Sequence, residues 1–165
     1  MKTKNLIDDL SSNNWEKALK ASDELSKYHS EDIFKQLITV LNKAQTQNTV
    51  NATALALREI KNNKAVVFLM KALDNTINKN NKSTILYALE NLDCSKYFFK
   101  IFTLFVSSKS FDVKLSAYTI LTEQKFIVTT FKILEAHKIL KHSNLSSEDI
   151  EIAKYILNKI GSSKL

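Results

Sequence analysis

Apolar residues along the chain recur at spacings of three and four, which is typical of one face of an α-helix. Within residues 14–45 the first stripe is Ala18, Ala21, Leu25 and Tyr28, and the second is Phe34, Leu37, Ile38 and Leu41. Between the stripes, Ser30 is a suitable N-cap residue, and Glu31 and Asp32 suit the positive end of the helix that follows. The pattern predicts two helices joined by a short polar turn.

This helix-pair pattern returns every 32 residues without a gap. The six apolar positions are Leu25, Tyr28, Phe34, Leu37, Ile38 and Leu41, then Leu57, Ile60, Val66, Leu69, Met70 and Leu73, then Leu89, Leu92, Phe98, Ile101, Phe102 and Phe105. In a fourth copy the same positions are Leu121, Gln124, Thr130, Ile133, Leu134 and His137, and three of them are no longer apolar. A lone helix pair cannot bury its apolar face, but stacked pairs bury one another.

We therefore predict an all-α fold: a right-handed α-solenoid of about four 32-residue helix-pair repeats with terminal capping helices, forming a single domain over residues 1–165. The predicted parts are an N-terminal cap at 1–13, repeats at 14–45, 46–77, 78–109 and 110–141, and a C-terminal capping helix at 146–161. Asn13 and Glu16 are expected to form a capping box at the start of the first repeat. Gly161 is expected to end the last helix as a C-cap glycine. As an alternative, the β-branched segment 123–131 is irregular or partly extended, and the array is shorter.

Helix pairs of this length in tandem resemble HEAT repeats, particularly the short bacterial HEAT-like kind. The segment FDVKLSAYTIL (111–121) is similar to the first-helix pattern of that family, and NNKSTILYAL (80–89) is a weaker version. The resemblance covers roughly residues 14–160, without the glycines and the arginine often seen in the family. It implies that the second helix of each pair lines a concave face. Tetratricopeptide repeats, with 34 residues, are the runner-up, but their Trp, Gly, Tyr and Pro signature is absent.

The composition supports a helical chain. There are no prolines and one glycine, whereas sheet proteins use both residues in their turns. The single cysteine, Cys94, excludes an internal disulfide. No apolar run suits a signal peptide or a membrane span, so we expect a cytoplasmic protein of bacterial type. The last residues, Ser163-Lys164-Leu165, match a peroxisomal signal, and we interpret the match as chance.

The most apolar stretch is KYFFKIFTLFV, residues 96–106. On a helix its apolar arc covers about two-thirds of the circumference, which predicts the second helix of a pair in the middle of an array. An exposed aromatic patch around Phe99 is the alternative. One narrow polar strip remains, made of Lys96, Lys100, Thr103 and Ser107.

Projecting this strip through the repeat predicts one partner-binding surface. Its candidate residues are Gln36, Lys43, Lys64, Phe68, Lys71, Lys96, Lys100, Thr103 and Lys132. The strip carries six lysines and two acids, Asp32 and Glu135. Phe68 is apolar where the first three copies are otherwise polar, so it is a candidate hot-spot anchor. The alternative is that the lysines only solvate an exposed face.

We find no catalytic constellation, and we expect no enzyme, no cofactor, no metal and no small-molecule substrate. His137 and His142 are five residues apart, so they do not share a helix face as zinc-binding pairs at i, i+4 do. With one glycine there is no glycine-rich phosphate loop. Cys94 has no companion cysteine and no positioned base that would make it a nucleophile.

Two hypotheses on function follow. The first is a non-enzymatic protein-interaction module, such as an adaptor, a regulator or an immunity-type protein, that binds an acidic partner surface. The second is a nucleic-acid-backbone-binding protein, because the formal net charge is +7 and HEAT-like DNA glycosylases of the alkyl-purine type have a similar architecture. That family uses Trp, Asp and Arg residues around the damaged base. Trp15 and Arg58 are single residues of their kinds here, so its active site does not carry over, and membrane binding is not expected.

Overall fold

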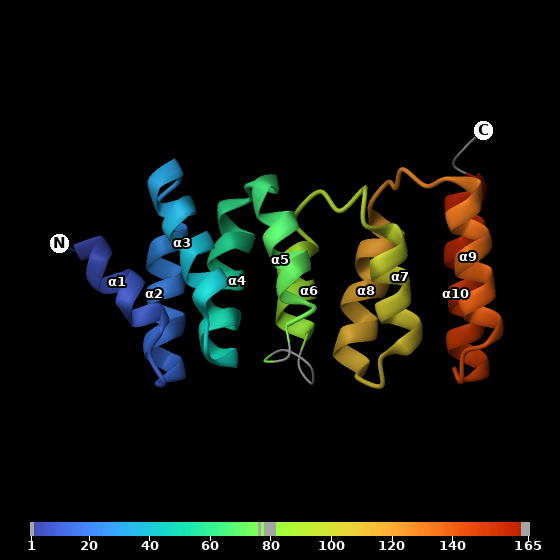
Figure 1. The fold of residues 1–165 in the computed structure, drawn as a ribbon, viewed down its shortest axis with the longest axis horizontal. Coiled ribbons are helices and arrows are strands. Elements are labelled where there is room, and N and C mark those ends of the chain that lie inside the picture. Colours follow the sequence, from blue (N-terminus) through green and yellow to red (C-terminus); the bar gives the residue numbers. More distant parts are fainter. Residues whose placement is uncertain (1, 76, 78–81, 163–165) are drawn as a thin grey trace. The chain divides into compact units, whose positions relative to one another are not determined.

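The computed structural model describes residues 2–75, 77 and 82–162 (Figure 1). The elements are α1 (Lys2–Leu10), α2 (Trp15–Ser26), α3 (Glu31–Lys43), α4 (Gln47–Ile60), the 3-10 helix η1 (Asn63–Ala65), α5 (Val66–Ala72), α6 (Ser83–Leu89), α7 (Phe98–Ser107), α8 (Phe111–Glu123), α9 (Thr130–Lys141) and α10 (Ser147–Ser162). Every regular element within the described residues is a helix, which confirms the prediction of an all-α fold. The tripeptide 163–165 and the predicted start of the third repeat at 78 lie outside the described residues.

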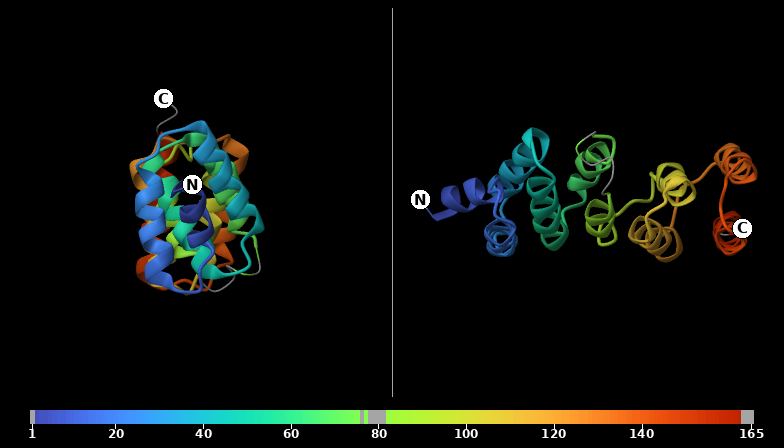
Figure 2. Two further views of the ribbon diagram at one scale, coloured as in Figure 1. Left: turned by 90° about the vertical axis from the view of Figure 1, so that its left-hand side faces the viewer. Right: turned by 90° about the horizontal axis from the view of Figure 1, so that it is seen from below.

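The chain forms two compact units, one ending at Asp93 and the other beginning at Cys94. We call them the N-terminal unit and the C-terminal unit and describe each by itself. In the N-terminal unit, α4 packs between α2 and α6, and these three helices form one layer (Figure 2, right). Helices α3 and α5 pack against each other in the second layer, and α1 packs against α2.

The C-terminal unit also consists of helix pairs. Helix α7 packs against α8 and α9, and α10 packs against α9 and α8. The core contains the aromatic residues that the sequence placed on the inner face of segment 96–106. The side chains of Phe98, Phe102 and Phe105 are each at most 2% exposed, and the rings of Phe98 and Phe102 stack at 5.6 Å.

The 32-residue pattern is visible in the burial of the first helix of each pair. Leu25, Leu57, Leu89 and Leu121 lie on α2, α4, α6 and α8, and the equivalent residue of α10 is Ala153. All five side chains are at most 1% exposed. The predicted register therefore holds at this position in both units, including the helix predicted to close the array.

Side-chain caps explain where several of these helices begin. The Oγ atom of Ser30 accepts a hydrogen bond from the N–H of Ile33, as the sequence predicted for the start of α3. At the start of α2, the cap is Asn14 rather than Asn13: its Oδ1 accepts from the N–H of Lys17 at 3.1 Å. The predicted capping residue was therefore wrong by one position.

The predicted role of Gly161 is also wrong. Helix α10 continues through Gly161 to Ser162, whose Oγ donates to the carbonyl of Asn158 at 2.8 Å. Gly161 does not have the positive φ that makes glycine favourable after a helix. Among the described residues, that conformation belongs to Lys61, with φ 54°, at the end of α4.

Both helices predicted for the fourth repeat are present, α8 and α9, but α9 packs against α7 and α10 rather than against α8, and it buries a different face from the one predicted. Thr130 and His137, which occupy core positions of the repeat, are exposed on α9, and the buried residues are Ala136 and Leu140. Residues 124–129 between α8 and α9 form no regular element. The sequence alternative of an irregular segment in this region therefore describes 124–129, while helix α9 follows it.

Candidate partner-binding surface

Five of the predicted binding residues lie in the N-terminal unit. Gln36 and Lys43 are on α3, Lys64 is in η1, and Phe68 and Lys71 are on α5. The three lysines are exposed, and Gln36 and Phe68 are half-buried. Helices α3 and α5 pack side by side, and η1 directly precedes α5, so these residues lie on neighbouring elements of the N-terminal unit.

A pocket of about 320 Å³ is lined by residues of α3 and α5, among them two of the predicted binding residues. Its lining is Leu41, Asn42, Val50, Phe68, Lys71, Ala72, Asp74 and Asn75. Leu41, Val50 and Phe68 give it an apolar part, and Lys71 contributes an ammonium group. An apolar recess beside a cation suits an apolar side chain that has an acidic neighbour.

Acidic groups reduce the positive charge of this surface more than the sequence indicated. The ammonium of Lys64 lies 3.3 Å from the carboxylate of Glu31. Gln36 donates a hydrogen bond to the Asp32 carboxylate at 2.6 Å, and Asp74 lines the pocket. Glu31 is the first residue of α3, and Lys64 lies in η1, at the equivalent turn of the next repeat.

Of the three predicted lysines in the N-terminal unit, Lys43 and Lys71 are exposed and have no ion pair within the described residues. They lie on α3 and α5, respectively. A partner carboxylate can therefore pair with either one without displacing an internal acid. Such pairs at the rim of an interface contribute mainly to association rate and specificity.

The other four predicted residues lie in the C-terminal unit. Lys96 is in the turn before α7 and is exposed, Lys100 and Thr103 are half-buried on α7, and Lys132 is exposed on α9. The hydroxyl of Thr103 donates to the carbonyl of Phe99 at 2.8 Å, so its hydrogen bond is made within its own helix. It stays a prediction that these residues and those of the N-terminal unit form one surface.

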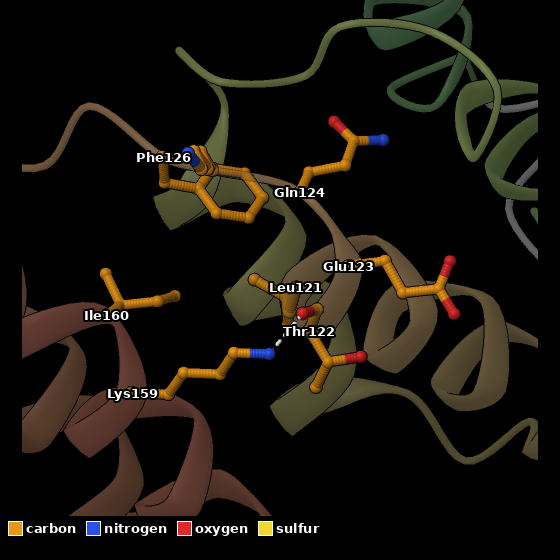
Figure 3. Close-up of a pocket in the computed structure, with 8 residues that line it drawn as sticks. Leu121, Thr122, Glu123, Gln124, Phe126, Lys159 and Ile160 are labelled. Atoms are coloured by element: carbon orange, nitrogen blue, oxygen red, sulfur yellow. Dashed lines mark hydrogen bonds between the residues drawn. The ribbon is translucent and has the colours of Figure 1, made fainter. Parts of the chain in front are cut away.

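A second pocket, of about 620 Å³, lies in the C-terminal unit between the end of α8 and the end of α10 (Figure 3). Lys159 on α10 reaches across and donates to the carbonyl of Thr122 at 2.5 Å. Gln124 accepts from the N–H of Cys94 at 2.9 Å, and the carboxylate of Glu123 points away from Lys159 (Figure 3). A catalytic site requires polar groups that converge on one point. The polar groups of this pocket point in different directions (Figure 3).

The only arginine in the sequence has a structural position. The guanidinium of Arg58 on α4 lies 3.8 Å from the ring centroid of Tyr87 on α6 and donates to the Tyr87 carbonyl at 2.6 Å. It also lies 3.5 Å from the Glu59 carboxylate. These contacts hold two helices of one layer together, and they occupy the group best suited to binding a phosphate in two-point fashion.

Candidate chemistry in the described residues is limited. No three His, Cys, Asp or Glu side chains in the described part of the chain are placed to hold a metal ion. Cys94 is completely buried, so its thiol is not accessible to a substrate. None of the helices described is both long and apolar enough to cross a membrane.

Sequence reasoning missed a group of exposed apolar residues in the C-terminal unit. Phe111 and Leu115 on α8 are 75% and 51% exposed, and Ile127, Phe131 and Leu134, before and on α9, are 75%, 67% and 56% exposed. The repeat register placed Leu134 at a core position. The loss of apolar residues at positions 130 and 137 was the signal that α9 does not bury that face.

No protein-family model matches this chain, and no curated protein does.

Proposed function

We propose that the protein is a non-enzymatic protein-interaction module, built as a HEAT-like α-solenoid, that binds an acidic partner surface. The binding residues are those predicted from the repeat, with Phe68 as anchor and the lysines as the charged rim. The protein would then act as an adaptor, a regulator or an immunity-type protein, without chemistry of its own.

The pocket beside Phe68 is the observation that carries this proposal. Phe68 is half-buried on α5 and lines an open recess together with Leu41 and Val50. A ring at such a position offers apolar area to a partner at a small entropic cost, because α5 already fixes it. Interface energy is concentrated at anchors of this kind.

The charge around the pocket selects the partner. Lys71 lines it and Lys43 lies on the neighbouring helix, both exposed. The formal net charge of +7 favours acidic surfaces over basic ones at the encounter stage. An acidic surface with one protruding apolar side chain fits both features.

The proposal is tested by affinity capture from a lysate of the source organism. The baits are the wild type, a variant with Phe68→Ala and Lys71→Glu, and a variant with Lys43→Glu and Lys71→Glu, each with and without nuclease. A matched control carries Lys20→Glu and Lys109→Glu, two exposed lysines outside the predicted surface. It has the same net charge as the double-lysine variant.

We expect a discrete protein on the wild type and on the matched control, with or without nuclease, and a loss of at least tenfold on both surface variants. Recombinant partner and calorimetry then give the stoichiometry and affinity. Equal recovery by all four baits would mean that the lysines only solvate the surface, and the proposal would be wrong.

The nuclease arm tests the second class of function, a nucleic-acid-backbone-binding protein. What supports this class is the excess of 24 basic over 17 acidic residues. What weighs against it is that Arg58 is already held by Tyr87. Nucleic acid that is recovered by the wild type and lost after nuclease treatment would favour the second class.

A further inference from the structure

Helix α9 and the residues before it present an apolar stripe to the surface. Ile127, Phe131 and Leu134 are spaced by four and three residues, and their side chains are more than half exposed. The N–H of Ile127 donates to the carbonyl of Ser95 at 3.0 Å, so the start of the stripe is tied to the C-terminal unit. We call these three residues the α9 stripe.

The α9 stripe lies opposite the face by which α9 packs into its own unit. The buried residues of α9 are Ala136 and Leu140. At about 100° per residue, the middle of Phe131 and Leu134 is roughly 170° away from the middle of that buried pair. The helix is thus apolar on two opposite faces, and the core uses only one of them.

Exposed lysines lie on α9 and in the segment before it. Those on or just before α9 are Lys125, Lys132, Lys138 and Lys141. All four are exposed, and no ion pair is found for them within the described residues. The one acid on α9 is Glu135, which is half-buried. At about 100° per residue, Lys138 and Lys141 lie one to two turns beyond Leu134 on the same side of α9, whereas Lys132 lies roughly 130° away from the stripe. An apolar stripe with cations before and after it is complementary to an apolar stripe flanked by acids.

We propose that the α9 stripe is a second docking surface, which binds an acidic amphipathic helix of a partner protein. The partner helix lays its apolar side chains against Phe131 and Leu134 of α9 and against Ile127 in the segment before it, and its acids reach Lys125, Lys138 and Lys141. This inference goes beyond the proposed function, since it concerns the C-terminal unit and does not depend on the Phe68 pocket.

A second copy of the same chain fits the α9 stripe less well. In a two-fold symmetric contact the same surface meets itself, so Lys138 and Lys141 of one copy would lie against the lysines of the other. Like charges placed against one another at an interface oppose association. The charge pattern therefore favours a partner of different sequence.

An anionic membrane also fits less well. Helices that lie in a membrane interface present a wide apolar face with the cations on the far side. The two residues of the α9 stripe that belong to the helix, Phe131 and Leu134, span only about 60° of its circumference. Glu135 lies next to that narrow arc on the helix. A narrow apolar line with flanking charges suits a second helix better than a bilayer.

The test is a selection from a phage-displayed library of random peptides of about 16 residues, roughly 24 Å of helix, against the full chain. Selected peptides are synthesised with a fluorophore and titrated by anisotropy. The variants are Phe131→Ser with Leu134→Ser, and Lys138→Glu with Lys141→Glu. The matched control is Phe111→Ser with Leu115→Ser, which removes exposed apolar residues from a different helix, α8.

We expect selected peptides with apolar residues at i, i+4, i+7 interleaved with Asp and Glu. Their affinity should fall at least tenfold in both α9 variants and stay within twofold in the α8 control. Circular dichroism should give the same helix content for all variants, because every changed side chain is exposed.

Three outcomes would overturn the proposal. The selected peptides could lack acids, or bind the α9 variants as tightly as the wild type, so that no stripe-dependent peptide is recovered. The wild type could bind vesicles of equal parts phosphatidylcholine and phosphatidylserine through Phe131 and Leu134. Sedimentation could show self-association that the Phe131→Ser, Leu134→Ser variant abolishes. None of these outcomes depends on the Phe68 pocket, so the two proposals fail separately.

Discussion

Phe68 and its neighbour Leu69 sit one residue apart on α5 and differ in what surrounds them. Leu69 is completely buried in the N-terminal unit, whereas Phe68 is half-buried and lines a pocket open to solvent. A partner contact and a core contact have different consequences when they are truncated. The two residues therefore form a matched pair for separating binding from stability.

We predict that Phe68→Ala lowers the free energy of unfolding by about 1 kcal/mol, because only part of its apolar area is lost from the fold. Leu69→Ala should cost about 2 to 5 kcal/mol, as a buried leucine does. Urea denaturation followed by circular dichroism measures both. A loss for Phe68→Ala as large as for Leu69→Ala would make Phe68 a packing residue and remove it from the proposed interface.

At the scale of helices, the C-terminal unit ties α8 to α10 near both ends of the two helices. Lys114 of α8 lies 2.5 Å from the carboxylate of Asp149 of α10, with both side chains 22% exposed. At the other end, Lys159 donates to the Thr122 carbonyl. The hydrogen bond from Lys114 holds the pKa of Asp149 below its ordinary value, and the Ser146 hydroxyl lowers it further.

A depressed pKa in the folded state links stability to pH in one direction. The ion pair contributes above the unfolded pKa of about 3.9, and the contribution is lost as the pH falls through the lower folded pKa. We predict that Asp149→Asn removes about 1 kcal/mol at pH 7 and flattens the acid limb of the stability curve.

Denaturation with urea between pH 3 and pH 7 checks this prediction. Asp23→Asn, on the exposed surface of α2, serves as the control and should leave the acid limb unchanged. If wild type and Asp149→Asn lost stability in parallel as the pH falls, the Lys114 contact would not persist in solution.

Small residues on helix α4 allow neighbouring helices to pack closely against it. Ala52, Ala54 and Ala56 are fully buried, and α4 packs against α2, α3 and α6. We predict that Ala54→Leu destabilises the protein by about 1 to 3 kcal/mol, because added carbons force neighbouring helices apart. Val67→Leu, at a position 54% exposed on α5, should change stability by less than about 0.5 kcal/mol. Thermal unfolding followed by circular dichroism measures both variants.

Helix positions were predictable from the sequence where the periodic pattern was complete. Leu25, Leu57 and Leu89 are spaced by 32 residues, and all three are buried. An apolar residue that recurs at the same position of each repeat is stable when it is buried in every copy. The buried face of α9 was not predictable from the same register. Two core positions of the repeat are polar there, Thr130 and His137, and the helix buries Ala136 and Leu140 instead. Local pattern cannot decide between two apolar faces of one helix.

The candidate site was predictable in part. The register placed Phe68 and Lys71 on one exposed strip, and the structure places both at one pocket. It did not anticipate that Glu31 would neutralise Lys64, because that ion pair joins residues of successive repeats through their turns. Contacts between repeats depend on the offset of the helices, which a sequence alone does not give.

For the molecule as a whole, the excess of lysine is the property that both functional hypotheses share. The chain has 24 basic residues, and its formal net charge is +7. Nonspecific binding to DNA requires that several cations reach phosphates at once and release their counterions. Arg58 is held against Tyr87, and Lys64 and Lys114 are ion-paired, so fewer cations are available than the composition indicates.

We therefore predict that the protein shows no saturable binding to duplex DNA at about 0.15 M salt and only weak binding, independent of sequence, at about 0.02 M salt. Fluorescence anisotropy with a labelled duplex of random sequence measures this, and a single strand of the same length is the comparison.

The Lys43→Glu, Lys71→Glu variant should weaken the low-salt signal by no more than the Lys20→Glu, Lys109→Glu control does, because long-range attraction follows net charge. Saturable binding at 0.15 M salt that the first variant loses and the control keeps would instead place nucleic acid on the surface around Phe68. In that case the acidic partner of this protein would be a phosphate backbone, and the protein-interaction proposal would be replaced.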